Sequence, residues 1–565
     1  MAQDSNFWLF VRENVIGRDV ETPTPFGHRK ITYADYTASG QGVAFIERYM
    51  EHILRLYGNT HTEDDATGAL TTERLHQAET IIKRTFNAGE HYRIIEAEYG
   101  TTGAVHRLQQ ILGIYIPPVA KDRFLSLFRS YFSGAELSRF ESFLVKNRPV
   151  IFVGPYEHHS NEVSWRECFC EVVETELTEN GLFSLQDLEK KVSSADYRNR
   201  MRIGAFSAAS NVTGVVTPIY EVARILHRYD ALAFFDFAAI APYAEVNVCR
   251  DSECYFDGIY FSPHKFLGGP GSAGILIIHE RIYRRDLPPT VGAGGTVDFV
   301  NFDEQEYNPD IEIREKPGTP GILQTMRAAL ALQLKEKIDL GKIESREKEM
   351  ISKALARCKQ TSEIEIMGNA DAENRIPILS FNIRTLKGYL HPRFVTALLN
   401  DLFGIQSRAG CSCAAPYGHR MLQIDHEKSL AFKKAIICGQ TGVKPGWTRV
   451  SFHFLMTDEG MNFICDAIEF VAQNGKYFLP LYDFDLCTGK WKHKSFTPLI
   501  ARFGLDEALE LAANVEEVNQ ETKPLKYLYL QYMKDAHEQV EKLKKTFRET
   551  ELKTTDKDLI PFLYA

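Results

Sequence analysis

The stretch that decides the fold reads Phe261-Ser262-Pro263-His264-Lys265-Phe266-Leu267-Gly268-Gly269. It follows a short apolar run, Gly258–Phe261, and places one lysine between a histidine and a glycine-rich turn. A lone lysine at a strand end is usually a solvated surface residue. The interpretation of Lys265 therefore depends on the sequence around it.

Six further apolar runs of strand length share this part of the chain with Gly258–Phe261, and helix-length segments separate several of them. The runs are Ile94–Tyr99, Val150–Val153, Phe169–Val173, Ile203–Phe206, Ala231–Phe235 and Ile275–Ile278. This alternation predicts an α/β fold with a mostly parallel sheet covered by helices on both faces. Ligands of such sheets bind beyond the carboxyl ends of the strands, and the polar motifs of this chain lie there.

The chain has 565 residues, and at about 150 residues per domain this favours two to four domains. We expect an N-terminal segment (1–40), a large domain (41–320), a long helix reaching about Lys359 with a small α/β domain (321–475), and a helical extension (476–565). Apolar residues recur at helical spacing in the extension, at Tyr529, Met533, Ala536, Val540, Leu543 and Phe547. This pattern predicts a helix packed on the body, with a partner-binding helix as the alternative.

The composition is that of an ordinary globular protein, with 44% hydrophobic and 25% charged residues. A net charge of −9 argues against nucleic acid as a partner, since a basic footprint is missing. The ten cysteines are scattered, which favours a reducing compartment. No signal peptide or membrane-spanning run is recognisable, so we expect a cytoplasmic protein without a membrane partner.

Four strand ends carry complementary polar groups. Asp236 ends the run Ala231–Phe235 and, if buried, needs a cationic or hydrogen-bonding partner; a protonated pyridine nitrogen would satisfy it. Tyr99–Gly103 offers backbone N–H groups and hydroxyls for a phosphate at a helix N-terminus. Glu157–Asn161 offers an imidazole to cover an aromatic ring, and Ser207–Asn211 offers an amide. With Lys265 for a Schiff base, these are the groups that pyridoxal phosphate requires.

The chain resembles the class V aminotransferase superfamily of pyridoxal-phosphate enzymes, and most closely its cysteine desulfurase and selenocysteine lyase branch. The resemblance covers roughly residues 30–475 and rests on the ordered motifs G-T-T, E-H-H-x-N, S-N-V-T-G, D-x-A, S-x-H-K, G-T-P and R-x-G-x-x-C. It implies a fold type I homodimer with the active site at the subunit interface. The expected fold is a large domain with a mostly parallel seven-stranded sheet, joined to a smaller α/β domain.

The resemblance also implies roles for individual residues. Lys265 is the Schiff-base lysine, Asp236 holds the ring nitrogen protonated, and His158 stacks on the ring and relays protons. Asn211 lies near the phenolic oxygen of the cofactor or near the substrate. The phosphate contacts are Thr101, Thr102, Ser262, His264 and, from the neighbouring subunit, Thr319.

The loop from Gln406 to Pro416 matches the nucleophile loop of the family, with Cys413 at the nucleophile position and Cys411 two residues before it. The resemblance also implies that Arg408 in this loop and Arg449 in the strand pattern Trp447–Phe452 bind the substrate, and a guanidinium suits a carboxylate because it pairs with it bidentately. Two interpretations without catalysis by Cys413 stay open. The thiols can be bystanders, or they can join His419 in a metal site, which lacks a fourth ligand at convincing spacing.

The sequence departs from the family in two respects. The family has glutamine after D-x-A, where this chain has Ala239, so one hydrogen bond to the phenolic oxygen is lost. Insertions lie around residues 115–147 and 419–447.

We expect a cysteine desulfurase-like C–S lyase that acts on a small amino acid, giving alanine and a persulfide on Cys413 for a possible sulfur-acceptor protein. The alternatives are another class V reaction (aminotransferase, isopenicillin-type epimerase or another lyase) and a non-catalytic cofactor-binding scaffold.

Overall fold

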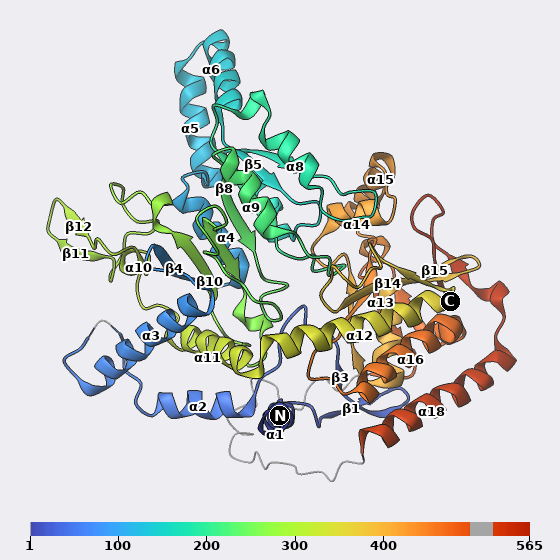
Figure 1. Ribbon diagram of the computed structural model, residues 1–565. Coiled ribbons are helices and arrows are strands. Elements are labelled where there is room, and N and C mark those ends of the chain that lie inside the picture. The colour runs from blue at the N-terminus through green and yellow to red at the C-terminus, as the bar shows by residue number, and fades with distance from the viewer. Residues whose placement is uncertain (1, 61, 498–523) are drawn as a thin grey trace.

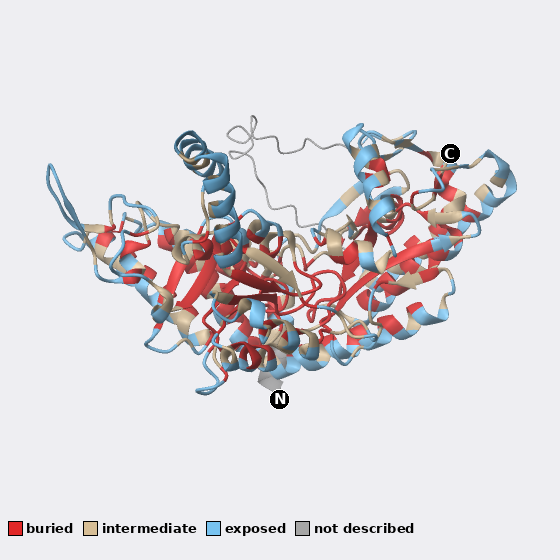
Figure 2. Cartoon of the chain, turned by 90° about the horizontal axis from the view of Figure 1, so that it is seen from above, coloured by how far each residue is buried: buried red, intermediate tan, exposed pale blue. Residues whose placement is uncertain are grey.

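The computed structural model describes residues 2–60, 62–497 and 524–565 (Figure 1). The chain forms two lobes, each built around its own sheet, and buried residues concentrate in the two sheets and in the loops between them (Figure 2). The N-terminal helix α1 (Ala2–Glu13) lies beneath the junction of the lobes.

The sheet of the large lobe has seven strands in the order β4-β10-β9-β8-β7-β5-β6. Six run parallel, while β10 is antiparallel to both of its neighbours. The strands are β4 (Tyr92–Ala97), β5 (Val150–Val153), β6 (Glu171–Glu174), β7 (Arg202–Ser207), β8 (Leu232–Asp236), β9 (Gly258–Phe261) and β10 (Gly274–His279). All seven predicted runs are thus strands of one sheet, which confirms the predicted fold.

Successive residues of a central strand enter two different cores. In β8, Phe234 packs in the core on one face of the sheet and Phe235 in the core on the other, as the alternation of side chains along a strand requires. Helix α4 (Gly100–Ile111) packs on β4, β9 and β10, and α9 (Ile219–Arg228) packs on β8. Helices therefore cover both faces of the sheet, and the polar residues at the strand ends are left available to form a ligand site.

The small lobe is built on β14 (Ile378–Thr385), which pairs with β13 (Ile364–Ile366), β15 (Gly388–Leu390) and β18 (Trp447–Ser451). Strand β17 (Arg408–Gly410) continues the sheet beyond β18. Helices α13 (Pro392–Phe403) and α16 (Asp458–Asn474) pack together in this lobe.

The C-terminal part of the chain returns to the small lobe. Strand β22 (Phe562–Tyr564) pairs in parallel with β15. Helix α18 (Leu525–Thr546) packs on α13 and α16 and buries Tyr532, Ala536 and Val540. The prediction of an amphipathic helix packed on the body is confirmed.

Two predicted elements differ. The extension over 476–565, expected to be helical, also contains strands, namely β19 (Tyr482–Asp485), β20 (Lys490–His493), β21 (Lys553–Thr554) and β22. The helix expected from about residue 321 to 359 is two helices, α11 (Ile322–Ile338) and α12 (Leu340–Gln360). They meet at Asp339, whose φ of +80° ends the first helix while its carboxylate accepts from the backbone N–H of Lys342 and caps the second. An aspartate favours such a cap, and this local preference overrides the continuous helical pattern.

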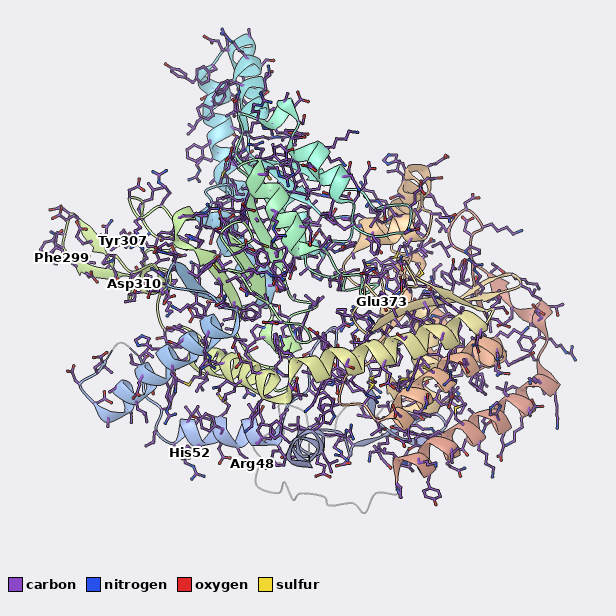
Figure 3. All side chains as sticks on the ribbon, viewed as in Figure 1. Arg48, His52, Phe299, Tyr307, Asp310 and Glu373 are labelled. Atoms are coloured by element: carbon purple, nitrogen blue, oxygen red, sulfur yellow. The ribbon has the colours of Figure 1, made fainter. Side chains whose placement is uncertain are left out.

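The insertions form separate surface elements. Residues 115–147 hold the antiparallel pair α5 (Pro118–Tyr131) and α6 (Gly134–Asn147), which projects from the large lobe (Figure 1). Residues 419–447 include α15 (His426–Ile437) on the small lobe. A two-stranded arm, β11 (Val297–Val300) and β12 (Gln305–Tyr307), carries Phe299 at the edge of the large lobe (Figure 3).

Candidate active site

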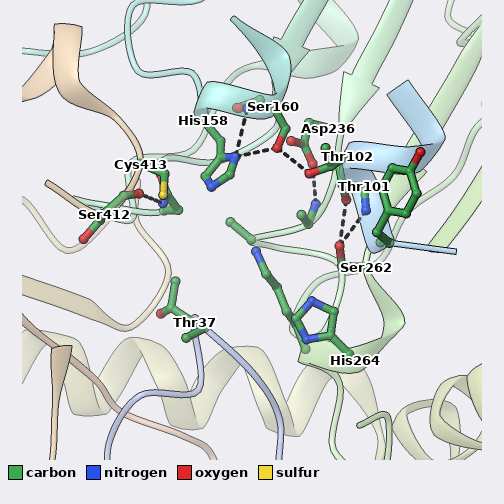
Figure 4. Close-up of a pocket in the computed structure, with 18 of the residues that line it drawn as sticks. Thr37, Thr101, Thr102, His158, Ser160, Asp236, Ser262, His264, Ser412 and Cys413 are labelled. Carbon is green, nitrogen blue, oxygen red and sulfur yellow. Dashed lines mark hydrogen bonds between the residues drawn. The ribbon is translucent and has the colours of Figure 1, made fainter. Parts of the chain in front are cut away.

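A cavity of about 470 Å³ lies between the lobes, at the carboxyl ends of the strands of the large sheet (Figure 4). Every site residue predicted from the sequence lines it except Thr319. The residues brought together are Thr101, Thr102, His158, Asn211, Asp236, Ser262, His264, Lys265, Arg408, Cys413 and Arg449. The folded chain thus assembles motifs from both lobes around one space.

Asp236 and Lys265 form the charged floor of this cavity. Asp236, 4% exposed at the end of β8, accepts a hydrogen bond from the backbone N–H of Ala238 (2.8 Å). Burial raises the pKa of Asp236 to about 6, against the opposing effects of Ala238 and of Lys265. Burial likewise lowers the pKa of Lys265 to about 8, although the carboxylate of Asp236 acts to raise it. Near neutral pH, Asp236 is thus an anion in need of a cation, and part of the Lys265 population is a neutral amine.

The G-T-T motif opens α4 against the turn that carries Lys265. The Ser262 hydroxyl accepts from the backbone N–H of Thr101 (2.8 Å), and their two hydroxyls are 2.9 Å apart. Gly100 has φ +61°, and a Cβ there would lie 2.7 Å from Ser262 Oγ. Only glycine leaves room for this approach. Hydroxyls and a helix N-terminus therefore converge as a cradle for a phosphate.

His158 is held as a neutral imidazole. Burial, together with the nearby Lys265, lowers its pKa to about 3. The Nδ1 atom accepts from the backbone N–H of Ser160 (3.1 Å) and lies 3.0 Å from Ser160 Oγ. The proton of the neutral ring is therefore on Nε2. Ser160 Oγ is also 2.7 Å from Thr102 Oγ1, which links the imidazole to the phosphate cradle.

Burial also lowers the pKa of His264, to about 4. Its Nδ1 lies 3.5 Å from Ser39 Oγ. His264 is therefore a neutral hydrogen-bonding group beside Lys265.

The E-H-H-x-N motif also supplies two residues behind the cavity, Glu157 and Asn161, for which the sequence predicts no role of their own. Glu157 accepts from the backbone N–H groups of Gly154 (3.0 Å) and Ser207 (2.8 Å), and so ties the ends of β5 and β7 together. Asn161 donates to Glu157 Oε2 (2.7 Å) and accepts from Tyr260 (2.5 Å). Their signal in the sequence is the glutamate and the asparagine at the two ends of this motif, which follows β5 after a short turn.

The loop that carries Cys413 turns sharply at the opposite wall. The N–H of Ala414 donates to the carbonyl of Cys411 (3.0 Å), and Ser412 and Cys413 have φ of +51° and +57°. Such left-handed conformations are costly for residues other than glycine. The large lobe holds the loop: His159 N–H donates to Cys413 O (2.8 Å), and Asn211 Nδ2 donates to Ser412 O (2.7 Å).

The two thiols of this loop differ in accessibility. Cys413 is exposed at the cavity, whereas Cys411 is partly buried against the large core. Of the two, Cys413 is the thiol placed to meet a substrate.

Arg408 and Arg449 are joined by a carboxylate from the N-terminal segment, Asp35, which the sequence interpretation did not single out. Asp35 accepts from Arg449 Nη2 and from Arg408 Nε, each at 2.9 Å. Arg449 also donates through Nη1 to the carbonyl of Asn211 (2.8 Å). No sequence pattern signals this contact, because Asp35 lies more than 370 residues away from both arginines.

Thr319 lies outside the cavity of its own chain. Its hydroxyl accepts from Asn59 Nδ2 (3.2 Å), and the residue lines a neighbouring cavity of about 300 Å³, of which Tyr99 is a shared wall. Ala239 lines the main cavity, so a methyl group lies where a glutamine is expected.

These residues fit pyridoxal phosphate. The buried Asp236 offers the anion that a pyridinium N–H needs, Lys265 offers an amine of lowered pKa, and the Thr101–Ser262 cradle suits a phosphate. A metal centre has no comparable support: within residues 2–60, 62–497 and 524–565, three or more His, Cys, Asp or Glu side chains nowhere gather as ligands. The same part of the chain holds no helix long and apolar enough to cross a membrane.

Solved structures share this architecture. A cysteine desulfurase from Thermococcus onnurineus superposes with a TM-score of 0.61 at 22% identity, over 78% of this chain and 95% of the other. A cysteine desulfurase from Escherichia coli gives 0.59 at 20% identity, over 82% and 97%. The fold is thus that of fold type I pyridoxal-phosphate enzymes.

Sequence comparison shows the family to which the chain belongs. The family model for class V aminotransferases matches residues 137–463, more than half of the chain. A probable cysteine desulfurase from Halalkalibacterium halodurans is 28% identical over 391 residues, covering 68% of this chain and 84% of that protein. A cysteine desulfurase from Synechococcus elongatus is 30% identical over 281 residues, 49% of this chain and 42% of that protein. The chain belongs to the class V aminotransferase family, whose members are pyridoxal-phosphate-dependent enzymes.

Proposed function

We propose that this chain binds pyridoxal phosphate and removes the sulfur of L-cysteine, leaving alanine and a persulfide on Cys413. The observation that carries the proposal is the convergence of Lys265, Asp236 and Cys413 on one cavity. The relatives named as cysteine desulfurases support the same reaction.

Four kinds of contact from this chain would hold the cofactor. Lys265 would bind it covalently, Asp236 would pair with the ring nitrogen, His158 would cover the ring, and Thr101, Thr102, Ser262 and His264 would hold the phosphate. Pyridoxal phosphate supplies an electron sink for negative charge at the Cα of an amino acid. Ala239 offers no hydrogen bond to the phenolic oxygen, so that contact falls to Asn211 or to the substrate.

The residues of the chain perform the remaining chemistry. Lys265, with its pKa near 8, takes the proton from the substrate Cα and returns it. Arg408 and Arg449 bind the substrate carboxylate. The thiolate of Cys413 attacks the substrate sulfur, so that an S–S bond forms as the C–S bond of the substrate breaks. The electron pair of that C–S bond stays with the three-carbon fragment, where the cofactor would delocalise it, and a proton taken up at Cβ completes alanine.

We further propose a homodimer in a cytoplasmic setting, with an acceptor protein that takes the sulfur from Cys413. The position of Thr319 supports the dimer, because this member of the motif set lies outside the cavity of its own chain, where its hydroxyl accepts from Asn59. In a dimer it would serve the cavity of the neighbouring subunit. The exposure of Cys413 supports transfer to an acceptor.

The test is to incubate the purified protein with L-cysteine and measure both alanine and sulfide. Cys413→Ala should keep the visible absorption of the bound cofactor and lose both products, with no persulfide on the chain by mass spectrometry. Cys438→Ala, which removes another exposed thiol, is the matched control and should leave turnover unchanged. Full activity of Cys413→Ala on the preferred amino acid would instead establish another class V reaction with bystander thiols.

A further inference from the structure

Arg408 and Arg449 are directly opposite each other on the antiparallel strands β17 and β18. Like charges at such positions repel one another. Arg449 is 3% exposed, and its Nε is buried without a hydrogen-bond partner among the described residues. The pair therefore needs a nearby anion for the fold to tolerate it.

Asp35 is that anion, and the backbone delivers it there. Strand β3 (Thr32–Tyr33) pairs in parallel with β16 (Ile405–Gln406), just before Arg408. The next residue, Ala34, donates to Gln406 O (3.0 Å) and accepts from the N–H of Ser451 (2.7 Å), just after Arg449. Asp35 thus emerges between the two strand ends, and each of its oxygens meets one guanidinium at 2.9 Å.

The bonding leaves the two arginines in different states. Arg449 has both Nη atoms committed, to Asp35 and to Asn211 O. Arg408 donates to Asp35 through Nε, and its side chain stays 49% exposed at the cavity. Both guanidiniums line the cavity, and Arg449 keeps a second N–H on each Nη atom, but the more accessible edge is that of Arg408.

Two positive charges and one negative charge leave a net single positive charge at this wall. We infer that Asp35 is a positioning and specificity residue, which limits this subsite to substrates with one carboxylate and an uncharged side chain. The inference rests on the proposed function for the identity of the site as a substrate subsite. A second negative charge on the substrate, as in aspartate or cysteine sulfinate, would find no net positive charge left at this wall once the first carboxylate is bound.

Variants that change the charge of Asp35 or Arg408 test the predicted net charge of this wall. In the wild type the three side chains sum to +1, in Asp35→Asn to +2, in Arg408→Gln to 0, and in the double variant again to +1. The probes are propionate and succinate, whose binding to the purified holoenzyme is measured by thermal shift at low salt, where screening is weak. Competition against L-cysteine and relative kcat/KM for cysteine sulfinate provide the second readout.

Asp35→Asn should raise the preference for succinate over propionate about tenfold, because the removed charge lies within hydrogen-bonding distance of the guanidinium that would bind the ligand. The double variant should return to the wild-type preference, which a merely structural role for Asp35 would not produce. Asp19→Asn is the matched control: it removes another carboxylate of the N-terminal segment, paired with Lys30 at 3.2 Å, and should change neither affinity.

An unchanged preference in Asp35→Asn, or a double variant that behaves like Asp35→Asn, would overturn the inference. If Asp35→Asn fails to fold, Arg408→Gln decides: it should lose about tenfold or more in propionate affinity, and unaltered affinity contradicts the charge count. The binding arm needs no turnover. A protein inactive on L-cysteine would therefore refute the proposed function while leaving the test of Asp35 valid.

Discussion

The two walls of the cavity are built in different ways. On the large lobe, Asp236 is the last residue of β8 and Lys265 follows β9 after a short turn, so their backbone is fixed by one sheet. On the small lobe, Arg408 lies on a short strand and Cys413 lies in a strained turn. That second wall is held by distant partners: His159 and Asn211 for the loop, Asp35 for the arginines.

The difference separates two tasks. A wall fixed by a sheet keeps the groups that serve a rigid, planar cofactor in register, and a few strand ends suffice for it. A wall fixed by contacts between distant parts of the chain can differ in charge, or in how far its side chains extend into the cavity, without any change in the sheet. We therefore expect changes on the first wall to abolish cofactor chemistry, and changes on the second to alter which substrate is used.

The largest effect should follow Lys265→Ala. This variant removes both the covalent attachment and the proton-transfer group, so activity on any amino acid should fall by about 10⁴-fold or more. The visible absorption band of the purified protein should disappear. Lys335→Ala is the control, since this buried lysine donates to Ala241 O and Ala244 O, away from the cavity. A Lys265→Ala protein that keeps the band would show that the first wall is misassigned.

Asp236→Asn should rank next, with a loss of about 100-fold to 1,000-fold in kcat, because it removes one buried electrostatic partner. It also has a pH signature. The carboxylate of Asp236 raises the pKa of Lys265, which is about 8 in the wild type; its removal must lower that pKa. Capture of pyridoxal phosphate by the cofactor-free protein needs the neutral amine. Its rate should thus rise with pH through about 8 in the wild type and at lower pH in Asp236→Asn, followed by stopped-flow absorbance.

The same contrast explains what the sequence could predict. All seven strands of the large sheet were recognisable as apolar runs, because a strand buried on both faces has few polar residues. The polar groups of the first wall lie at or just after the ends of these runs. Their place could be predicted because ligands of such sheets bind beyond the carboxyl ends of the strands. The sequence pattern does not predict the break between α11 and α12, because the break depends on one capping aspartate within a continuous helical pattern.

The second wall could be predicted only by likeness to the family. Arg408, Cys413 and Arg449 were identified by their motifs, but no local pattern tells that Asp35 bridges the two arginines. A carboxylate near the N-terminus becomes a site residue only when β3 pairs with β16. Long-range pairing of this kind depends on tertiary structure, which propensity and periodicity do not encode.

Arg449→Lys should have an intermediate effect. It should also distinguish the two walls most clearly, because it changes substrate binding and leaves cofactor binding unchanged. A lysine can reach only one of the two acceptors, Asp35 or Asn211 O, because it lacks the planar fork. We expect KM for L-cysteine to rise by about tenfold to 100-fold with the cofactor band unchanged. Arg420→Lys, an exposed side chain on helix α14 (Ala415–Met421), is the control. A fall in kcat with constant KM would mean that Arg449 serves the chemical step instead.

The smallest effect should come from Ser160→Ala, which tests whether the first wall is itself adjustable. The hydroxyl connects His158 Nδ1 (3.0 Å) with Thr102 Oγ1 (2.7 Å), but the backbone N–H of Ser160 still donates to Nδ1 after the change. His158 therefore keeps its tautomer, and only the link to the phosphate cradle is lost. One hydrogen bond of this kind corresponds to about twofold to tenfold in cofactor affinity.

Titration of cofactor-free Ser160→Ala with pyridoxal phosphate should show this weakening, with kcat at saturating cofactor nearly unchanged. Ser160→Thr should restore the affinity, because it returns the hydroxyl to the same position. Ser142→Ala is the surface control, as its hydroxyl donates within α6, to Ser138 O. If kcat at saturating cofactor instead fell by about 100-fold, the loss would have the size of a proton-transfer contribution, and the Ser160 hydroxyl would move a proton through His158. The first wall would then depend on a side-chain relay in addition to the sheet that fixes its backbone.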